Sequence, residues 1–146
     1  MSDVEFTNNS IQIKKAIREK AIAFLEEAAG EVQTAVHNAS RVDTGETRGS
    51  YTYVVDESEL EAIVGSPEEN AIWEEFGTGE YAVNGNGRKG GWYYEDKKGN
   101  GHFTHGKTPN RPLEKAFKAT NGAIQNRANE IFGELNNEYS SIKLCW

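Results

Sequence analysis

The chain has 146 residues, of which 36% are hydrophobic and 27% charged, a composition typical of one ordinary soluble domain and unlike that of most multidomain enzymes. With 16 Lys and Arg against 23 Asp and Glu, the net charge of −7 argues against general binding to nucleic acid phosphates. The single cysteine, Cys145, cannot form an intramolecular disulfide, so we expect one domain over residues 1–146 that folds in a reducing cytoplasm.

No membrane association is expected. The chain contains no apolar run near the roughly 20 residues that span a bilayer, and its polar, acidic start, MSDVEFTNNS, differs from a signal peptide.

A long amphipathic helix is predicted near the amino terminus. Apolar residues recur at intervals of three and four from Ile13 to Ala39, which is the period of one helix face. Residues 40–49 break this pattern.

Two antiparallel strands are predicted next. Residues 51–55 and 60–64 are rich in Tyr, Val and Ile, and the short polar stretch 56–59 suits a hairpin connection. Residues 71–76 fit either a short helix or a strand, because the segment is too short for its period to decide.

A glycine-rich region follows, since nine of the fifteen glycines lie between Gly77 and Gly106. We expect a mobile loop over about 79–108 or a projecting hairpin, in which 92–94 and 102–105 flank a turn at 96–101.

A second long helix is predicted after Pro109, with Asn110 as a candidate cap and Pro112 in the first turn. The core therefore covers about residues 10–138, followed by a flexible tail over about 139–146. The order of elements predicts an α+β fold in which both long helices cover one face of an antiparallel sheet.

The charges are segregated along the chain. Residues 49–87 contain no Lys or Arg, whereas the following segment is mainly basic. The two segments could be ordinary solvated surfaces, or could be complementary faces through which identical copies meet head to tail.

No catalytic, metal or cofactor site is expected. His102 and His105 with Glu95 or Asp96 could suggest a metal site, but no specific ligand motif is present. Two pairs of neighbouring glutamates could suggest a small hydrolase, although such pairs usually belong to a solvated face. These pairs are Glu68 with Glu69 and Glu74 with Glu75.

Three consecutive aromatic residues, Trp92, Tyr93 and Tyr94, follow the basic pair Arg88 and Lys89. Such aromatics could stack on bases or sugars, anchor a protein interface, or pack into the core. The residues alone leave these three interpretations open.

Three short motifs, taken in their order along the chain, resemble the motifs of a known protein family. The first is Asp43-Thr44-Gly45 with Ser50, the second is Glu75-Phe76-Gly77-Thr78, and the third is Pro109 with Pro112 at the start of the last helix. In order and spacing, these motifs resemble the tail-component family of tailed bacteriophages, whose members are also called minor capsid, neck or tail-completion proteins. With the flanking helices, the resemblance spans about residues 10–138.

The motifs also have a physical interpretation. Asp43 and Thr44 suit an Asx-type turn in which Gly45 adopts a positive φ. Phe76 would be buried at the end of its element, and Gly77 would let the backbone leave it.

The resemblance implies a structural virion protein that assembles as a ring at the head–tail junction of a long-tailed phage. It would act by binding, in tail completion or head–tail joining, after its synthesis in the bacterial host cytoplasm. The implied partners are copies of itself and other neck, connector or tail-tube proteins, with no specific nucleic acid. Arg88, Lys89, Trp92, Tyr93 and Tyr94 are then the expected interface residues. The alternatives are a generic protein-interaction module and a small nucleic-acid-binding domain that uses the basic aromatic loop.

Overall fold

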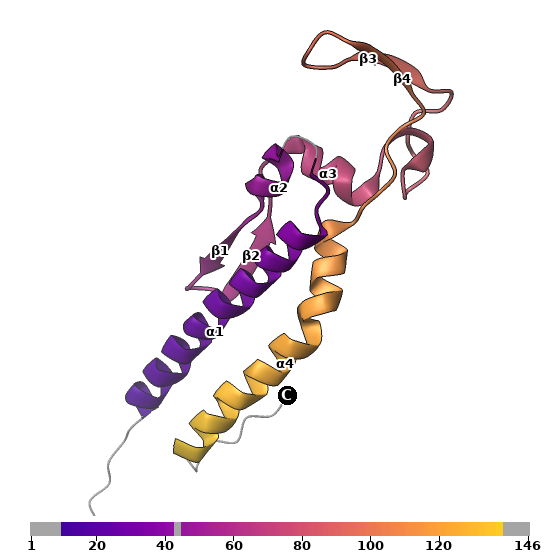
Figure 1. The fold of residues 1–146 in the computed structure, drawn as a ribbon. Helices are drawn as coiled ribbons and strands as arrows, with labels where there is room; N and C mark the ends of the chain where they lie inside the picture. Colours follow the sequence, from indigo (N-terminus) through magenta and orange to yellow (C-terminus); the bar gives the residue numbers. More distant parts are fainter. Residues whose placement is uncertain (1–9, 43–44, 139–146) are drawn as a thin grey trace, which may run out of the picture.

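The computed structural model describes residues 10–42 and 45–138 of the chain. It has an α+β fold with two small antiparallel sheets and long helices at either end, which confirms the predicted fold class (Figure 1). The expectations for Asp43, Thr44 and the tail at 139–146 lie outside the described residues.

The first helix, α1, covers Ser10–Ala39, as the apolar period predicts. Its 30 residues make a rod about 45 Å long. The helix ends where the Ser40 hydroxyl donates to the Val36 carbonyl over 2.6 Å and the Asn110 side-chain amide donates to the Ala39 carbonyl over 2.8 Å. A residue 71 positions away in the sequence thus satisfies one of the free carbonyls at the end of α1.

A short helix, α2 (Glu46–Ser50), leads into the first sheet and is absent from the prediction for residues 40–49. Gly45 precedes α2 with the expected positive φ of 85°. The sheet pairs β1 (Thr52–Asp56) with β2 (Glu61–Gly65), close to the predicted strands. The Asp56 carboxylate accepts hydrogen bonds from the Ser58 and Glu59 amides, which fixes the turn between the strands.

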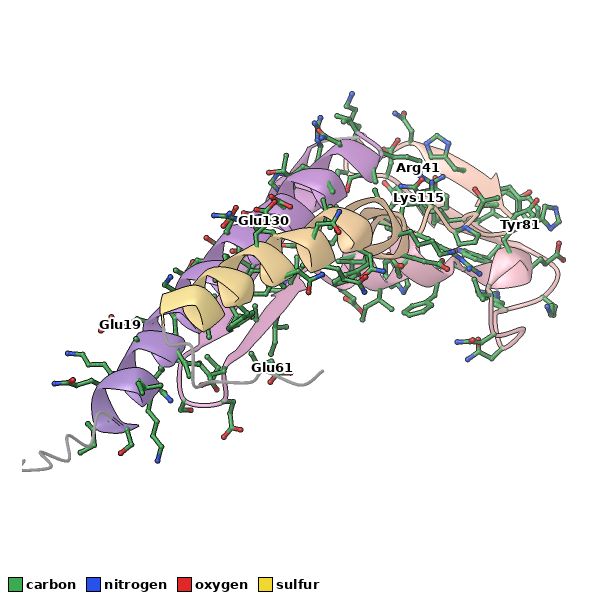
Figure 2. All side chains as sticks on the ribbon, turned by 90° about the horizontal axis from the view of Figure 1, so that it is seen from below. Glu19, Arg41, Glu61, Tyr81, Lys115 and Glu130 are labelled. Atoms are coloured by element: carbon green, nitrogen blue, oxygen red, sulfur yellow. The ribbon has the colours of Figure 1, made fainter. Side chains whose placement is uncertain are left out.

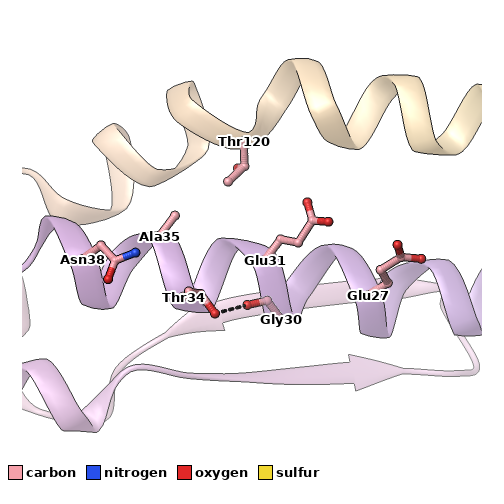
Figure 3. A pocket seen from close by; sticks show the side chains of 7 residues that line it. All are labelled: Glu27, Gly30, Glu31, Thr34, Ala35, Asn38 and Thr120. Atoms are coloured by element: carbon pink, nitrogen blue, oxygen red, sulfur yellow. Dashed lines mark hydrogen bonds between the residues drawn. The ribbon is translucent and has the colours of Figure 1, made fainter.

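The arrangement of the layers differs from the prediction that both long helices cover one sheet face. The first sheet packs against α1 with Tyr53, Val55, Ala62 and Val64 partly buried. The last helix, α4 (Pro112–Glu138), packs along the opposite side of α1 and runs antiparallel to it (Figures 1 and 3). A sheet of two five-residue strands is covered by one helix, so α4 buries its apolar stripe on α1.

Contacts along α4 hold the helix pair together. Phe24 meets the edge of Phe132 at 6.4 Å between ring centroids, and Arg127 pairs with Glu27 at 3.1 Å. The helix continues through Gly122 and Gly133 without a break. No helix within residues 10–42 and 45–138 has the length and apolarity that crossing a membrane requires.

The hydrophobic core is small and lies where α1, the start of β1, α3 (Glu69–Phe76) and the first turns of α4 meet. The buried residues of this core are Val32, Val36, Tyr51, Ala71 and Ala116. Residues 71–76, left open between helix and strand by the sequence, are helical.

Beyond α3, the chain forms a 3-10 turn, η1 (Gly79–Tyr81), and then a second hairpin of β3 (Trp92–Glu95) and β4 (Gly101–Thr104). This hairpin projects from one end of the helix pair (Figure 1). Of the two expectations for the glycine-rich region, the structure therefore has the projecting hairpin. We call residues 82–104 the arm and the paired segments 77–80 and 105–107 the neck.

Candidate assembly interface

The neck is formed by two backbone segments that cross at close range. The Thr78 amide donates to the Lys107 carbonyl over 2.9 Å, and the Lys107 amide donates to the Thr78 hydroxyl over 2.8 Å. The Glu80 amide donates to the His105 carbonyl over 2.9 Å. These hydrogen bonds fix the direction in which the arm leaves the body of the protein.

Glycine is required at the crossing. Gly77 has a φ of 73°, and a Cβ there would lie 2.9 Å from the Lys107 carbonyl oxygen and 2.9 Å from Pro109 Cδ. A Cβ on Gly79, whose φ is 61°, would collide with the His105 carbonyl oxygen. The predicted role of Gly77, which frees the backbone to leave α3, is confirmed.

Two neighbouring glutamates join the neck to both long helices. Glu74 is 7% exposed and pairs with Arg41, after α1, at 3.2 Å and with Lys107 of the neck. Its carbonyl accepts the Asn110 and Arg111 amides over 2.8 and 3.1 Å. Two cations therefore compensate a buried carboxylate that would otherwise be costly.

Glu75 supplies the cap of α4. One carboxylate oxygen accepts the Leu113 amide over 3.0 Å and the other accepts the Glu114 amide over 3.1 Å. The negative charge also lies at the positive end of the helix dipole. Asn110, the cap suggested by the sequence, instead bonds the end of α1.

The remaining motif residues lie around this junction, with one exception. The Ser50 hydroxyl donates to the Thr47 carbonyl over 2.6 Å, Pro109 is partly buried, and Pro112 is fully buried at the first position of α4. Phe76 is 49% exposed, so the expectation that it is buried is wrong. The side of α3 that faces the core carries Ala71 and Glu74, which leaves Phe76 on the outer side.

The arm is a two-stranded hairpin whose side chains contact one another across the strands. Tyr93 opposes Phe103 with ring centroids 4.8 Å apart, and Tyr94 stacks on His102 at 5.3 Å. The Arg88 guanidinium lies 5.6 Å from the Trp92 ring centroid, a cation–π distance. Tyr93 is 80% exposed and Tyr94 48% exposed, so neither packs into the core.

The turn at the tip of the arm is organised by Asp96. One of its oxygens accepts the Lys98 and Asn100 amides, both over 2.9 Å, and the other lies 2.8 Å from His102 Nε2. Chiefly the hydrogen bond from His102, and also that from Asn100, lowers the pKa of Asp96 to about 2.

One ion pair connects the tip to the body. Lys97 Nζ lies 2.8 Å from the Glu46 carboxylate of α2, and this contact lowers the pKa of Glu46 and raises that of Lys97. Both side chains are mostly exposed, so solvent screens the pair and it contributes little to stability. The tip is therefore held only weakly.

Exposed apolar residues also occupy two surfaces that the sequence pattern does not single out. On α3, Ile72 and Trp73 are 59% and 42% exposed, in line with Phe76. On the first sheet, Val54 and Ile63 oppose each other across the strands and are 64% and 59% exposed. The alternation of side chains along β1 and β2 could have pointed to Val54 and Ile63, because one face of the sheet packs on α1 and the other does not.

An open groove of about 530 Å³ lies between α1 and α4 (Figure 3). Gly30, Ala35 and Thr120 are among its lining residues, and the Thr34 hydroxyl donates to the Gly30 carbonyl over 3.0 Å. Two carboxylates, Glu27 and Glu31, lie along its rim, and Arg127 holds the first of them. The lining contains no His or Cys that could act with these carboxylates.

The residues suggested for other chemistry have structural partners. Glu74 and Glu75 are held by cations and backbone amides, as described above. His102 pairs with Asp96, and His105 lies 3.4 Å from Glu80. Within the described part of the chain, no three His, Cys, Asp or Glu side chains are grouped to hold a metal ion.

Comparison with known protein families gives a match to the first half of the chain. A family model described as "Bacteriophage HK97-gp10, putative tail-component" matches residues 5–77, which is half of the chain. The matched segment includes α1, the first sheet and the Glu74–Glu75 pair, and it ends at Gly77 of the neck. No curated protein and no solved structure matches the sequence.

Proposed function

Because the chain belongs to the HK97-gp10-like family of bacteriophage tail components, we propose that it acts at the head–tail junction of a long-tailed phage. Its role there is to complete the tail or to join it to the head, as a ring of identical subunits. The mechanism is binding between virion proteins and requires no cofactor.

The observation that carries this proposal is the position of two oppositely charged regions on one elongated subunit. The turn between β1 and β2 bears Asp56, Glu57, Glu59 and Glu61. The Arg18 guanidinium of α1 donates to the Glu57 carbonyl, and four carboxylates therefore face one cation there. The arm bears Arg88, Lys89, Lys97 and Lys98 against Glu95 and Asp96.

These regions lie far apart along the long axis of the molecule. The β1–β2 turn lies toward the amino-terminal part of α1, whereas the arm projects beyond its other end (Figure 1). From below, Glu61 of the turn and Tyr81 at the base of the arm are likewise far apart along the long axis (Figure 2). Different surfaces of one subunit that attract each other favour head-to-tail contacts, which close into a ring when the rotation permits.

The aromatic residues of the arm suit an interface. Tyr and Trp are frequent among the residues that dominate binding energy, and charged residues commonly surround them at the rim. Trp92, Tyr93 and Tyr94 are the anchors in this proposal, and Arg88 and Lys89 are the rim charges. Other neck, connector or tail-tube proteins are the further partners.

The test is electron microscopy of lysates from a phage or prophage that encodes this protein, with its gene deleted and with the gene supplied in trans. Separate heads and tails, or tails with abnormal ends, are expected without the gene, and joined particles are expected after complementation. Normal infectious particles without the gene would refute the role.

A further inference from the structure

We propose that the outer face of the β1–β2 sheet is the surface that receives the arm of a second copy of this chain, with Tyr93 and Phe103 packed on Val54 and Ile63. The inference rests on the proposed assembly into a ring and names the two surfaces that meet in it.

The receiving face is apolar at its centre and acidic at one end. Val54 and Ile63 form a cross-strand pair on the side of the sheet away from α1. The next pair on that face is Asp56 with Glu61, and the turn beyond it adds Glu57 and Glu59. No residue within 10–42 or 45–138 covers Val54 or Ile63, which remain more than half exposed.

The arm has a matching surface. Tyr93 and Phe103 form a cross-strand pair on one face of its hairpin, and the turn beyond them carries Lys97 and Lys98. Both surfaces are thus two-stranded hairpins with one exposed apolar pair and a charged turn, and the two turns differ in sign. Two such hairpins can stack face to face about 10 Å apart, the ordinary spacing of packed sheets.

The charges select one orientation of this stack. When both turns point the same way, Lys97 and Lys98 lie over the acidic turn while the two apolar pairs are in register. Glu95 shares the Tyr93 face of the arm and opposes this attraction in part. Asp96 of the arm's turn is already bound by His102 and by the Lys98 and Asn100 amides, whereas the acidic turn presents four carboxylates to Lys97 and Lys98.

The arm cannot make this contact within its own chain. The neck directs it away from the sheet, and its tip lies at α2, beside the end of β1 that is opposite the acidic turn (Figure 1). The Lys97–Glu46 pair that holds the tip there is exposed. Lys97 can therefore leave Glu46 and pair with the carboxylates of a neighbouring copy at little cost. A second copy is therefore the occupant that fits.

The first experiment replaces Tyr93 by the photoreactive residue benzoylphenylalanine, which the 80% exposure of this position accommodates. Joined particles that contain this variant are irradiated and the cross-linked peptides are mapped. The proposal requires a product of twice the subunit mass that links position 93 to residues 51–65. A cross-link to α3, to another virion protein or within one chain, or no product in joined particles, would overturn it. The ring itself could still be correct in those cases, whereas particles that never require the gene would refute the proposed function.

The second experiment tests the orientation by charge reversal. Lys98→Glu is expected to lower the yield of joined particles about tenfold, and addition of Glu61→Lys should restore most of the yield. Lys98→Glu with Glu31→Lys is the matched control, because it has the same net charge but places the lysine in the α1–α4 groove. Equal rescue by both double variants, or rescue by neither, would contradict the stacked arrangement.

Discussion

Tyr51 offers a direct test of how the junction between the sheet, α1 and the neck is balanced energetically. Its side chain is 1% exposed, and its hydroxyl is buried with no hydrogen-bond partner among residues 10–42 and 45–138. Its backbone carbonyl, in contrast, accepts the Gln33 amide over 3.0 Å and contacts His37 Nε2 at 3.2 Å. The perturbation of choice is Tyr51→Phe, which removes the hydroxyl and leaves the ring and these backbone contacts in place.

The expected effect is stabilisation. A buried polar group without a partner costs about 1–3 kcal/mol, so Tyr51→Phe should raise the free energy of unfolding at neutral pH by about 1–2 kcal/mol. Most substitutions of buried residues destabilise a protein, which makes the sign of this result informative.

The same residue predicts a pH dependence. Burial, with smaller contributions from the nearby carboxylates of Glu75 and Glu74, raises the pKa of Tyr51 from 10.0 to about 12. The unfolded state therefore loses this proton at lower pH than the folded state does. The native contribution is complete below pH 10 and is lost as the pH rises toward 12, with about 1 kcal/mol lost by pH 11.

The assay is urea denaturation of the wild type and of Tyr51→Phe at pH 7 and at pH 11. Other groups titrate in both proteins, so the difference between the two isolates Tyr51. The stability advantage of Tyr51→Phe should grow by about 1 kcal/mol between the two pH values. A variant that is less stable at pH 7, or a difference that does not change with pH, would refute the reasoning.

Four further experiments test the neck and the arm. Glu75→Gln should lower the free energy of unfolding by about 1–2 kcal/mol in urea denaturation, because one α4 amide loses its acceptor and the helix loses a favourable charge; Glu69→Gln should change little, and equal effects would contradict the capping role. Gly79→Ala should destabilise by about 3 kcal/mol or more, whereas Gly85→Ala, with a similar positive φ but open space, should cost only about 1 kcal/mol; thermal unfolding that ranks them equally would show that the crossing can relax. The pKa of Asp96, followed by NMR, should be about 2 and should rise toward 3.8 in His102→Ala. Because the paired form is the carboxylate, its contribution to the turn is complete above pH 3.8 and is lost as the pH falls through about 2. An Asp96 pKa that does not change in His102→Ala would show that the two residues are not coupled. Trp92→Ala with Tyr94→Ala should abolish assembly in complementation while thermal stability stays normal, whereas loss of folding would assign both residues to the core.

Local sequence patterns were sufficient for most of the elements. The apolar period of residues 13–39 predicts α1, the two short β-rich segments predict β1 and β2, and turn chemistry at 96–101 predicts the hairpin of the arm. Each of these patterns lies within a few neighbouring residues. In α1, β1 and β2 the pattern is an apolar face, and in the arm it is a turn that needs glycine. The positive φ of Gly45 and the role of Gly77 in letting the backbone leave α3 were predictable for the same reason.

Contacts between distant residues decided the rest. The sequence shows a Glu74–Glu75 pair but does not show that one carboxylate is buried between Arg41 and Lys107 while the other caps a helix that begins 37 positions later. Asn110 is a residue type that often caps helices and stands just before α4, yet its side-chain amide donates to the Ala39 carbonyl at the end of α1. Phe76 follows a helical pattern, but only the packing of α3 determines that it faces outward.

The two long helices, the first sheet and the hairpin of the arm were therefore determined by the sequence itself, since they depend on short-range periodicity and turn propensity. The tertiary structure alone decided that α4 packs on α1 rather than on the sheet, and that Val54 and Ile63 remain uncovered. Burial of an apolar stripe depends on which surfaces meet, and that is a property of the assembled layers that no local segment contains.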